Sequence, residues 1–152
     1  ISPTGTALLE ASQAGHLGTV KTLLAAGADP NASGGETSEH DHYGALTAAI
    51  TGGHTLVIHA LLDAGADPQE GVFTHLSSHP WDVYETALTR AARKGDQDIV
   101  ETLLRYTAGE KRGGAALCAA AVLGDVKKVQ DLITAGVGIG SLTVWDRTAL
   151  HL

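Results

Sequence analysis

Cysteine and aromatic side chains are scarce in this chain of 152 residues. The single cysteine, Cys118, excludes an internal disulfide framework, and we expect it to be a small buried residue in an Ala-rich helix. Two Trp, three Tyr and one Phe are the only aromatic residues. A core of Ala and Leu with so few rings is typical of short helices that pack closely together.

An excess of basic charge and long apolar segments are also missing. The net charge of −7 argues against a general nucleic-acid or membrane surface, because both favour a basic stripe. No apolar run approaches the roughly 18 residues of a membrane span, and no signal peptide is visible. We therefore expect an intracellular protein, cytoplasmic or nuclear, with neither a nucleic-acid nor a membrane partner.

What the chain does have is a repeated phrase of eight residues. Residues 23–30 read LLAAGADP, and residues 61–68 read LLDAGADP. Each copy follows a Gly-His pair at the same distance, and two later glycines followed by Asp extend the pattern. The four anchoring glycines are Gly15, Gly53, Gly95 and Gly124.

The sequence around each anchor predicts a pair of short helices. A first helix is expected to start at residues 6, 44, 86 and 115, with a fifth start at residue 148, and Thr6, Thr86 and Thr148 are candidate N-caps. Glycine ends each first helix because it adopts the left-handed C′ conformation without a Cβ penalty. Apolar residues at i, i+3 and i+4 then form one stripe on each second helix. These stripes are Val20, Leu23 and Leu24; Ile58, Leu61 and Leu62; Val100, Leu103 and Leu104; and Val129, Leu132 and Ile133.

This pattern resembles the ankyrin repeat, whose period is about 33 residues. The Gly-His junction and the Leu-Leu-x-x-Gly-Ala-Asp ending match, while Ala replaces Pro in the Thr-Pro-Leu-His opening. The resemblance implies an all-α solenoid of stacked helix–turn–helix repeats with finger loops, and hydrogen-bonding roles for His16 and His54 between neighbouring loops. It divides a single domain, residues 1–152, into repeats at about 4–31, 42–69, 84–112 and 113–140, with a truncated fifth from 146. We expect a fragment of a longer repeat array.

The junctions between repeats differ in length, and insertions in a solenoid map to loops on one face. Against the period of about 33, the first two junctions are longer by roughly five and nine residues. Both insertions fall in the finger region, so we expect them to be neighbours. They carry aromatic residues typical of interface anchors: Tyr43, Phe73, Trp81 and Tyr84. Phe73 and Trp81 have an alternative role, which is to pack the longer loop onto the stack.

The same insertions hold four of the eight histidines. His40 and His42 would point to one side of an extended finger, with Asp41 between them. His75 and His79 would align only on a helical turn. Together these residues are candidates for a zinc or copper site or for acid–base catalysis, although solvated histidines explain the same spacing. No Cys supports a metal site, and no nucleophile motif or phosphate-binding loop is present, so we assign neither a metal nor a cofactor.

The third repeat places three basic residues on its first helix. Arg93 and Lys94 follow Arg90 at i+3 and i+4, so the three residues lie on one face of the helix. They are candidates to receive a carboxylate or phosphate, and an exposed helix end that keeps the stack soluble is the alternative. The third junction is shorter by roughly four residues than the period. We expect a stunted finger there, with Gly113-Gly114 as a tight turn or hinge.

These features favour a protein-binding scaffold that uses its concave groove and its lengthened finger loops. The expected partner-binding residues are Tyr43, Phe73, Trp81, Asp82, Tyr84, Arg90, Arg93 and Lys94. The alternative is a small-molecule or metal-binding enzyme built from His40, Asp41, His42, His75 and His79. Another protein is the expected partner, and a small molecule is the alternative.

Overall fold

A computed structural model of the chain describes residues 3–32, 44–69, 71–74, 83–107 and 111–137. The chain forms two compact units, Ile1–Arg90 and Ala91–Leu152. The division falls inside helix α5, which begins in the first unit and ends in the second. Each unit is built from helix pairs of the kind that the repeated phrase predicts.

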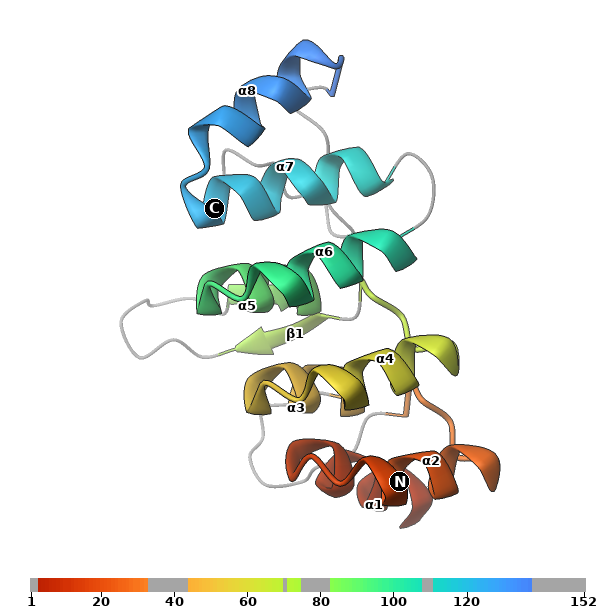
Figure 1. Ribbon diagram of the computed structural model, residues 1–152. Coiled ribbons are helices and arrows are strands. Elements are labelled where there is room, and N and C mark those ends of the chain that lie inside the picture. Colours follow the sequence, from red (N-terminus) through yellow and green to blue (C-terminus); the bar gives the residue numbers. More distant parts are fainter. Residues whose placement is uncertain (1–2, 33–43, 70, 75–82, 108–110, 138–152) are drawn as a thin grey trace. The chain divides into compact units, whose positions relative to one another are not determined.

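The first unit contains two helix pairs that stack on each other. The first helices α1 and α3 pack together, as do the second helices α2 and α4 (Figure 1). Each first helix also packs on its own second helix. These helices are α1 (Pro3–Gln13), α2 (Leu17–Ala25), α3 (Ala45–Gly52) and α4 (Thr55–Asp63).

Glycine ends the first helix of each pair, as predicted. Gly53 has a φ of 74°, and its N–H donates to the carbonyl of Ile50 at 3.1 Å. The next N–H, that of His54, donates to the carbonyl of Ala49 at 3.0 Å. A side chain at this left-handed residue would be strained. The same positive φ recurs at Gly15, Gly27, Gly65, Gly95, Gly124 and Gly136.

Helix starts agree less well with the sequence predictions. Thr6 is not an N-cap, because α1 already begins at Pro3 and a proline is well suited to the first helical position. Thr86 is a cap, as predicted: the Thr89 N–H donates to Thr86 Oγ1 at 3.1 Å. The Thr86 N–H in turn donates to Thr89 Oγ1 at 2.9 Å. The pair forms a reciprocal capping box in which Thr takes the place of the usual Glu or Gln.

The core of the first unit lies between the helix pairs. Residues 45–50 of α3 are all buried, so this helix is covered on every side. Ala48 and Ala49 allow close approach of the neighbouring helices, while Leu46 and Ile50 supply apolar volume, and each of the four is at most 1% exposed. In α4 the predicted stripe of Ile58, Leu61 and Leu62 is fully covered.

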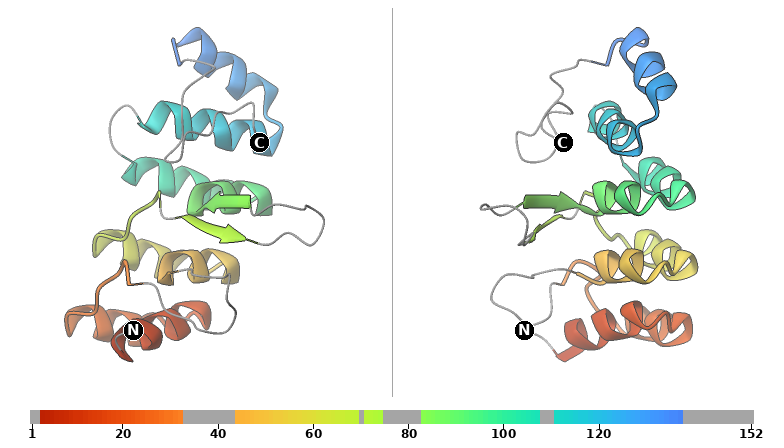
Figure 2. Two further views of the ribbon diagram at one scale, coloured as in Figure 1. Left: turned by 180° about the vertical axis from the view of Figure 1, so that it is seen from behind. Right: turned by 90° about the vertical axis from the view of Figure 1, so that its left-hand side faces the viewer.

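The segment after α4 contains a hairpin that the sequence analysis did not predict. Strands β1 (Gly71–Thr74) and β2 (Val83–Thr86) pair antiparallel, with Gly71 opposite Thr86 and Phe73 opposite Tyr84. Figure 2 shows the two strands side by side. Val, Phe, Tyr and Thr favour strands, which accounts for the pairing. The all-α repeat fold is therefore confirmed, with this short two-stranded sheet added to it.

The second unit contains α6 (Gln97–Tyr106), α7 (Lys111–Leu123) and α8 (Val126–Thr134). Helix α7 packs on both α6 and α8. It begins before the expected start at Ala115, so Gly113 and Gly114 lie inside a helix and the predicted turn or hinge is wrong. Residues 107–110 separate α6 from α7, and the predicted stunted finger falls on residues 108–110, which lie outside the described ranges.

Helix α8 is the least covered helix of the second unit. None of its residues is buried. Val126 is 75% exposed, and Ile133, from the predicted apolar stripe, is 40% exposed. The stripe is therefore present in the sequence of α8, but its side chains are not enclosed as they are in α4.

Candidate functional site

Most of the predicted finger-loop residues lie outside the part of the chain that the structure describes. This applies to both pairs of histidines and to the aromatic and acidic residues beside them. Phe73 and Tyr84 are the exceptions, because β1 and β2 place their backbones opposite each other in register. The residues outside the described ranges are His40, Asp41, His42, Tyr43, His75, His79, Trp81 and Asp82.

Helix α5 (Ala87–Lys94), which follows β2 directly, carries the predicted basic residues. One side of the helix is apolar: Leu88 is 2% exposed and Ala91 is fully covered. Arg90 is half-buried, whereas Arg93 and Lys94 in the last turn are exposed. Cations in the last turn of a helix are favoured by its negative dipole end. The three basic residues therefore differ in exposure, although they are close in sequence.

Arg90 is held against helix α3 by a chain of two hydrogen bonds. Its Nη1 donates to Thr51 Oγ1 at 3.1 Å, and Thr51 Oγ1 donates to the backbone carbonyl of Thr47 at 2.9 Å. Sequence reasoning missed Thr51, because the acceptor lies one repeat earlier in the chain. The guanidinium therefore has a structural contact in addition to any role toward a partner.

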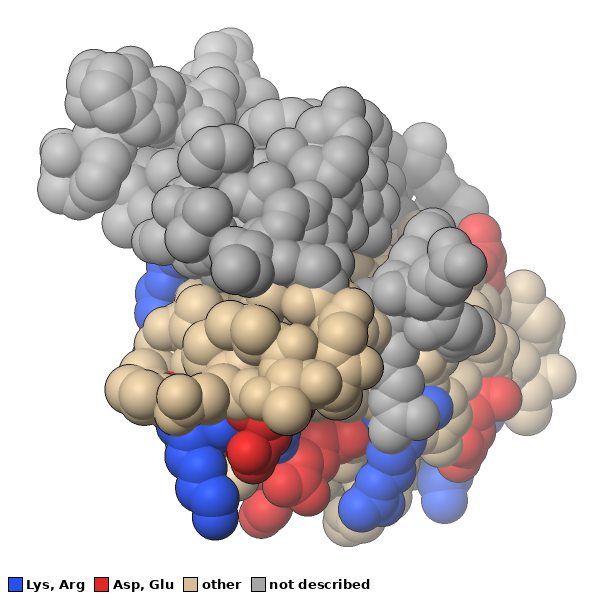
Figure 3. Space-filling model, turned by 90° about the horizontal axis from the view of Figure 1, so that it is seen from above, with Lys and Arg blue, Asp and Glu red and all other residues tan. Residues whose placement is uncertain are grey.

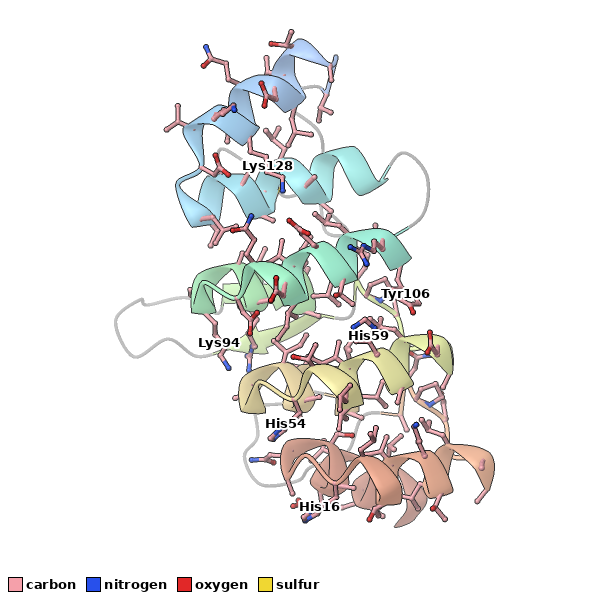
Figure 4. All side chains as sticks on the ribbon, in the orientation of Figure 1. His16, His54, His59, Lys94, Tyr106 and Lys128 are labelled. Atoms are coloured by element: carbon pink, nitrogen blue, oxygen red, sulfur yellow. The ribbon has the colours of Figure 1, made fainter. Side chains whose placement is uncertain are left out.

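His54 joins the first two repeats, which confirms the role that the resemblance implied. Its ring nitrogen Nε2 donates to the carbonyl of Gln13 at 3.0 Å. The ring lies between two glycines, since a Cβ at Gly15 or at Gly52 would fall within 2.6 Å of ring atoms. Figure 4 shows His54 between α3 and α1. His16, at the matching position of the first repeat, is exposed.

A second bridge between these repeats comes from Asn31, which sequence reasoning did not single out. Asn31 Nδ2 donates to the carbonyl of Gly65 at 3.0 Å, and Asn31 Oδ1 accepts from the Asp67 N–H at 2.8 Å. Asp29 holds the backbone of Asn31 in place, because Asp29 Oδ1 accepts from the Asn31 N–H at 2.9 Å. The signal in the sequence was the position of Asn31 directly after the Asp-Pro turn.

Cys118 is buried, as expected, and is 1% exposed. Burial raises the pKa of its thiol above the ordinary value, because the thiolate would be desolvated. Across the described ranges, no group of three or more His, Cys, Asp or Glu side chains is placed to hold a metal ion. The described helices include none that is long and apolar enough to cross a membrane.

Comparison with known families gives a match over part of the chain. The model of the ankyrin repeat family matches residues 5–34, which contain α1, α2 and the first copy of the repeated phrase. The search of curated proteins finds no match. The helix pairs closed by positive-φ glycines continue this pattern beyond the matched segment.

Proposed function

Because residues 5–34 match the ankyrin repeat family, we propose that the chain is a scaffold whose finger residues and α5 cations contact another protein. Ankyrin repeats generally serve protein interaction, through surfaces that the stacked repeats present to a partner. The proposed contact residues are Tyr43, Phe73, Trp81, Asp82, Tyr84, Arg90, Arg93 and Lys94.

The hairpin is the observation that supports this surface best. It gives part of the second inter-repeat segment a regular backbone, with Phe73 opposite Tyr84. Helix α5 begins at the residue after β2, so the hairpin leads directly into the helix that bears Arg93 and Lys94. Aromatic anchors supply most of the affinity in protein interfaces, and neighbouring charges supply specificity.

Binding measurements on two kinds of variant test the proposal. Partners are first identified by proximity labelling in cells and are then titrated against the purified chain. We expect Trp81→Ala and Tyr84→Ala each to weaken binding by more than about 1 kcal/mol, as for a hot-spot residue. Arg93→Glu should weaken binding of the same partner and reduce its dependence on salt.

Matched controls lie elsewhere on the chain. Tyr106→Ala removes an aromatic residue that is 39% exposed on α6, and Lys21→Glu reverses an exposed charge on α2. Both should leave affinity unchanged, and circular dichroism should show that every variant is folded. If Trp81→Ala and Tyr84→Ala bind every identified partner as tightly as these controls do, the finger residues are not the contact surface.

We further propose an intracellular setting, cytoplasmic or nuclear, for this interaction. A chain with one cysteine, which is buried, forms no internal disulfide that an oxidising compartment would maintain. Cell fractionation of the tagged protein, with a secreted and a nuclear marker beside it, tests the compartment. Recovery of the protein only from the medium or the secretory pathway would contradict this setting.

A further inference from the structure

A hollow of about 540 Å³ opens in the second unit between its helices. Helices α6 and α8 form its sides and α7 contributes to its floor. This volume lies within the range of sites that hold ligands or partner side chains, about 300–1,000 Å³. The residues that carry the argument are Glu101, Leu104, Arg105, Ala116, Lys128 and Leu132.

Within the described part of the second unit, the residue that corresponds to His54 does not bridge consecutive repeats. In the first unit, His54 and Asn31 tie consecutive repeats together, and α2 packs directly on α4. In the second unit, Asp125 stands where His54 stands in the earlier repeat. Its carboxylate caps its own helix by accepting from the Lys128 N–H at 3.0 Å, so it is not available as a bridge.

The floor of the hollow is apolar. Leu104 is 7% exposed and Ala116 is 8% exposed, and Leu132 lies half-buried opposite them on α8. Gly113 also lines the hollow, and a Cβ there would lie 3.2 Å from Val137 Cγ2. A leucine-sized side chain would bury apolar area here, at about 25 cal/mol per Å².

The rim is charged, with two cations and one anion. Glu101 and Arg105 stand at i and i+4 on α6, on the same side as Leu104. Lys128 stands across from them on α8, one turn before Leu132, and Figure 4 shows its side chain extending over α7. Figure 3 shows both acidic and basic side chains on the face that it draws.

Within the described ranges, no other protein group pairs with the two rim cations. Among the described residues, the side chains of Arg105 and Lys128 form no hydrogen bond or ion pair. An apolar floor beside two such cations is complementary to a carboxylate that is attached to an apolar group. The net charge of −7 disfavours a polyanion such as nucleic acid. A single carboxylate is small enough to interact with the two rim cations alone.

We propose that this hollow binds a segment of a partner protein in which Glu or Asp lies next to a leucine-sized residue. The apolar side chain occupies the floor at Leu104 and Leu132, and the carboxylate pairs with Arg105 and Lys128. Glu101 sets the orientation, because it repels a carboxylate placed at its end of the rim. The surface belongs to α6, α7 and α8, and does not rest on the finger residues proposed above.

A capped peptide tests the proposal without knowledge of the partner. The ¹⁵N-labelled chain is titrated with acetyl-Leu-Glu-Leu-Leu-amide, whose caps remove the terminal charges, and amide shifts are followed by NMR. We expect saturable shifts at Leu104, Arg105, Lys128 and Leu132, with a Kd near 1 mM or below, a contribution of about 4 kcal/mol. The peptide with Gln in place of Glu should bind about tenfold more weakly.

Two adjacent lysines provide a matched pair of variants. Lys128→Glu reverses the charge at the rim, while Lys127→Glu makes the same change at an exposed residue of α8 that does not line the hollow. Position 128 is the third residue of α8, where Glu is favoured near the helix N-terminus, so the variant should fold. We expect about tenfold weaker binding for Lys128→Glu and no change for Lys127→Glu. Ala116→Met should abolish binding by filling the floor.

Three results would overturn the proposal. The first is equal affinity for the Glu and Gln peptides, and the second is an equal effect of the two lysine variants. The third is binding of octanoate at the same amides with an affinity equal to that of the peptide. That result would assign the hollow to a small molecule with a free carboxylate. The finger variants Trp81→Ala and Tyr84→Ala should bind the peptide as tightly as the unchanged chain does. Failure of the hollow proposal can therefore be distinguished from failure of the proposed finger contact surface.

Discussion

His54 shows how one side chain can connect two repeats. Its ring fills the space between Gly15 and Gly52, and its Nε2 reaches the carbonyl of Gln13. His54→Ala should lower the free energy of unfolding by about 1–2 kcal/mol, because it removes a hydrogen bond and leaves a gap. Urea unfolding followed by circular dichroism measures the change.

His16→Ala is the matched control for this prediction. It makes the same substitution at the same position of the preceding repeat, where the ring is exposed. We expect a change within about 0.5 kcal/mol, as for surface substitutions in general. Equal losses in the two variants would mean that the bridge to Gln13 contributes nothing measurable.

Thr47 and Thr89 are both buried threonines, but their hydroxyl groups differ in hydrogen bonding. Thr47 Oγ1 has no hydrogen-bond partner among the described residues, whereas Thr89 Oγ1 accepts from the Thr86 N–H. Thr47→Val should therefore stabilise the protein by about 1 kcal/mol, because the unpaired hydroxyl is replaced by a methyl of similar size. Thr89→Val should destabilise it by about 1–2 kcal/mol. Thermal unfolding of both variants checks the signs, and a loss of stability in Thr47→Val would contradict the assignment.

At the scale of the element, the capping box at the start of α5 fixes where the hairpin ends and the helix begins. Thr86 is both the last residue of β2 and the N-cap of the helix. Thr86→Ala should cost about 1–2 kcal/mol, since the Thr89 N–H loses its acceptor. Thr86→Ser keeps the hydroxyl and should restore most of this loss in chemical denaturation. If Ser restores nothing, the methyl group of Thr86 and not its hydroxyl stabilises the junction.

Helix ends could be predicted from the sequence better than helix starts. Gly53 and its counterparts mark the ends because the left-handed conformation excludes most other residues. The starts are less constrained, so α1 extends back to Pro3 and α7 to Lys111. The hairpin was missed because the two strands, each four residues long, form only when they pair with each other.

The candidate sites show the same limit on prediction from sequence. The sequence shows that Arg90 is a cation. Its hydrogen bond to Thr51 could not be predicted, because that contact depends on how two repeats stack. The hollow in the second unit likewise depends on how α6, α7 and α8 pack together. Asp125 in place of His was visible in the sequence, yet its role as a cap follows only from the position of the Lys128 N–H.

At the scale of the whole molecule, the uneven burial of the second helices predicts uneven stability. In a repeat protein, stability is close to a sum of contributions from repeats and their interfaces. Helix α4 buries four residues and lies between bridges, whereas α8 buries none. Amides in α8 should therefore exchange with deuterium faster than those in α4, because local opening there exposes little apolar surface.

Leu61 and Leu103 allow a matched test of whether the two units open separately. Both are 0% exposed and occupy equivalent positions, in α4 of the first unit and α6 of the second. Each Leu→Ala substitution should cost about 2–5 kcal/mol. Under native conditions, hydrogen exchange measured by mass spectrometry should show that Leu103→Ala raises exchange in α6–α8 more than in α1–α4, and that Leu61→Ala does the reverse. If both variants raise exchange equally along the chain, the two units unfold as one cooperative body.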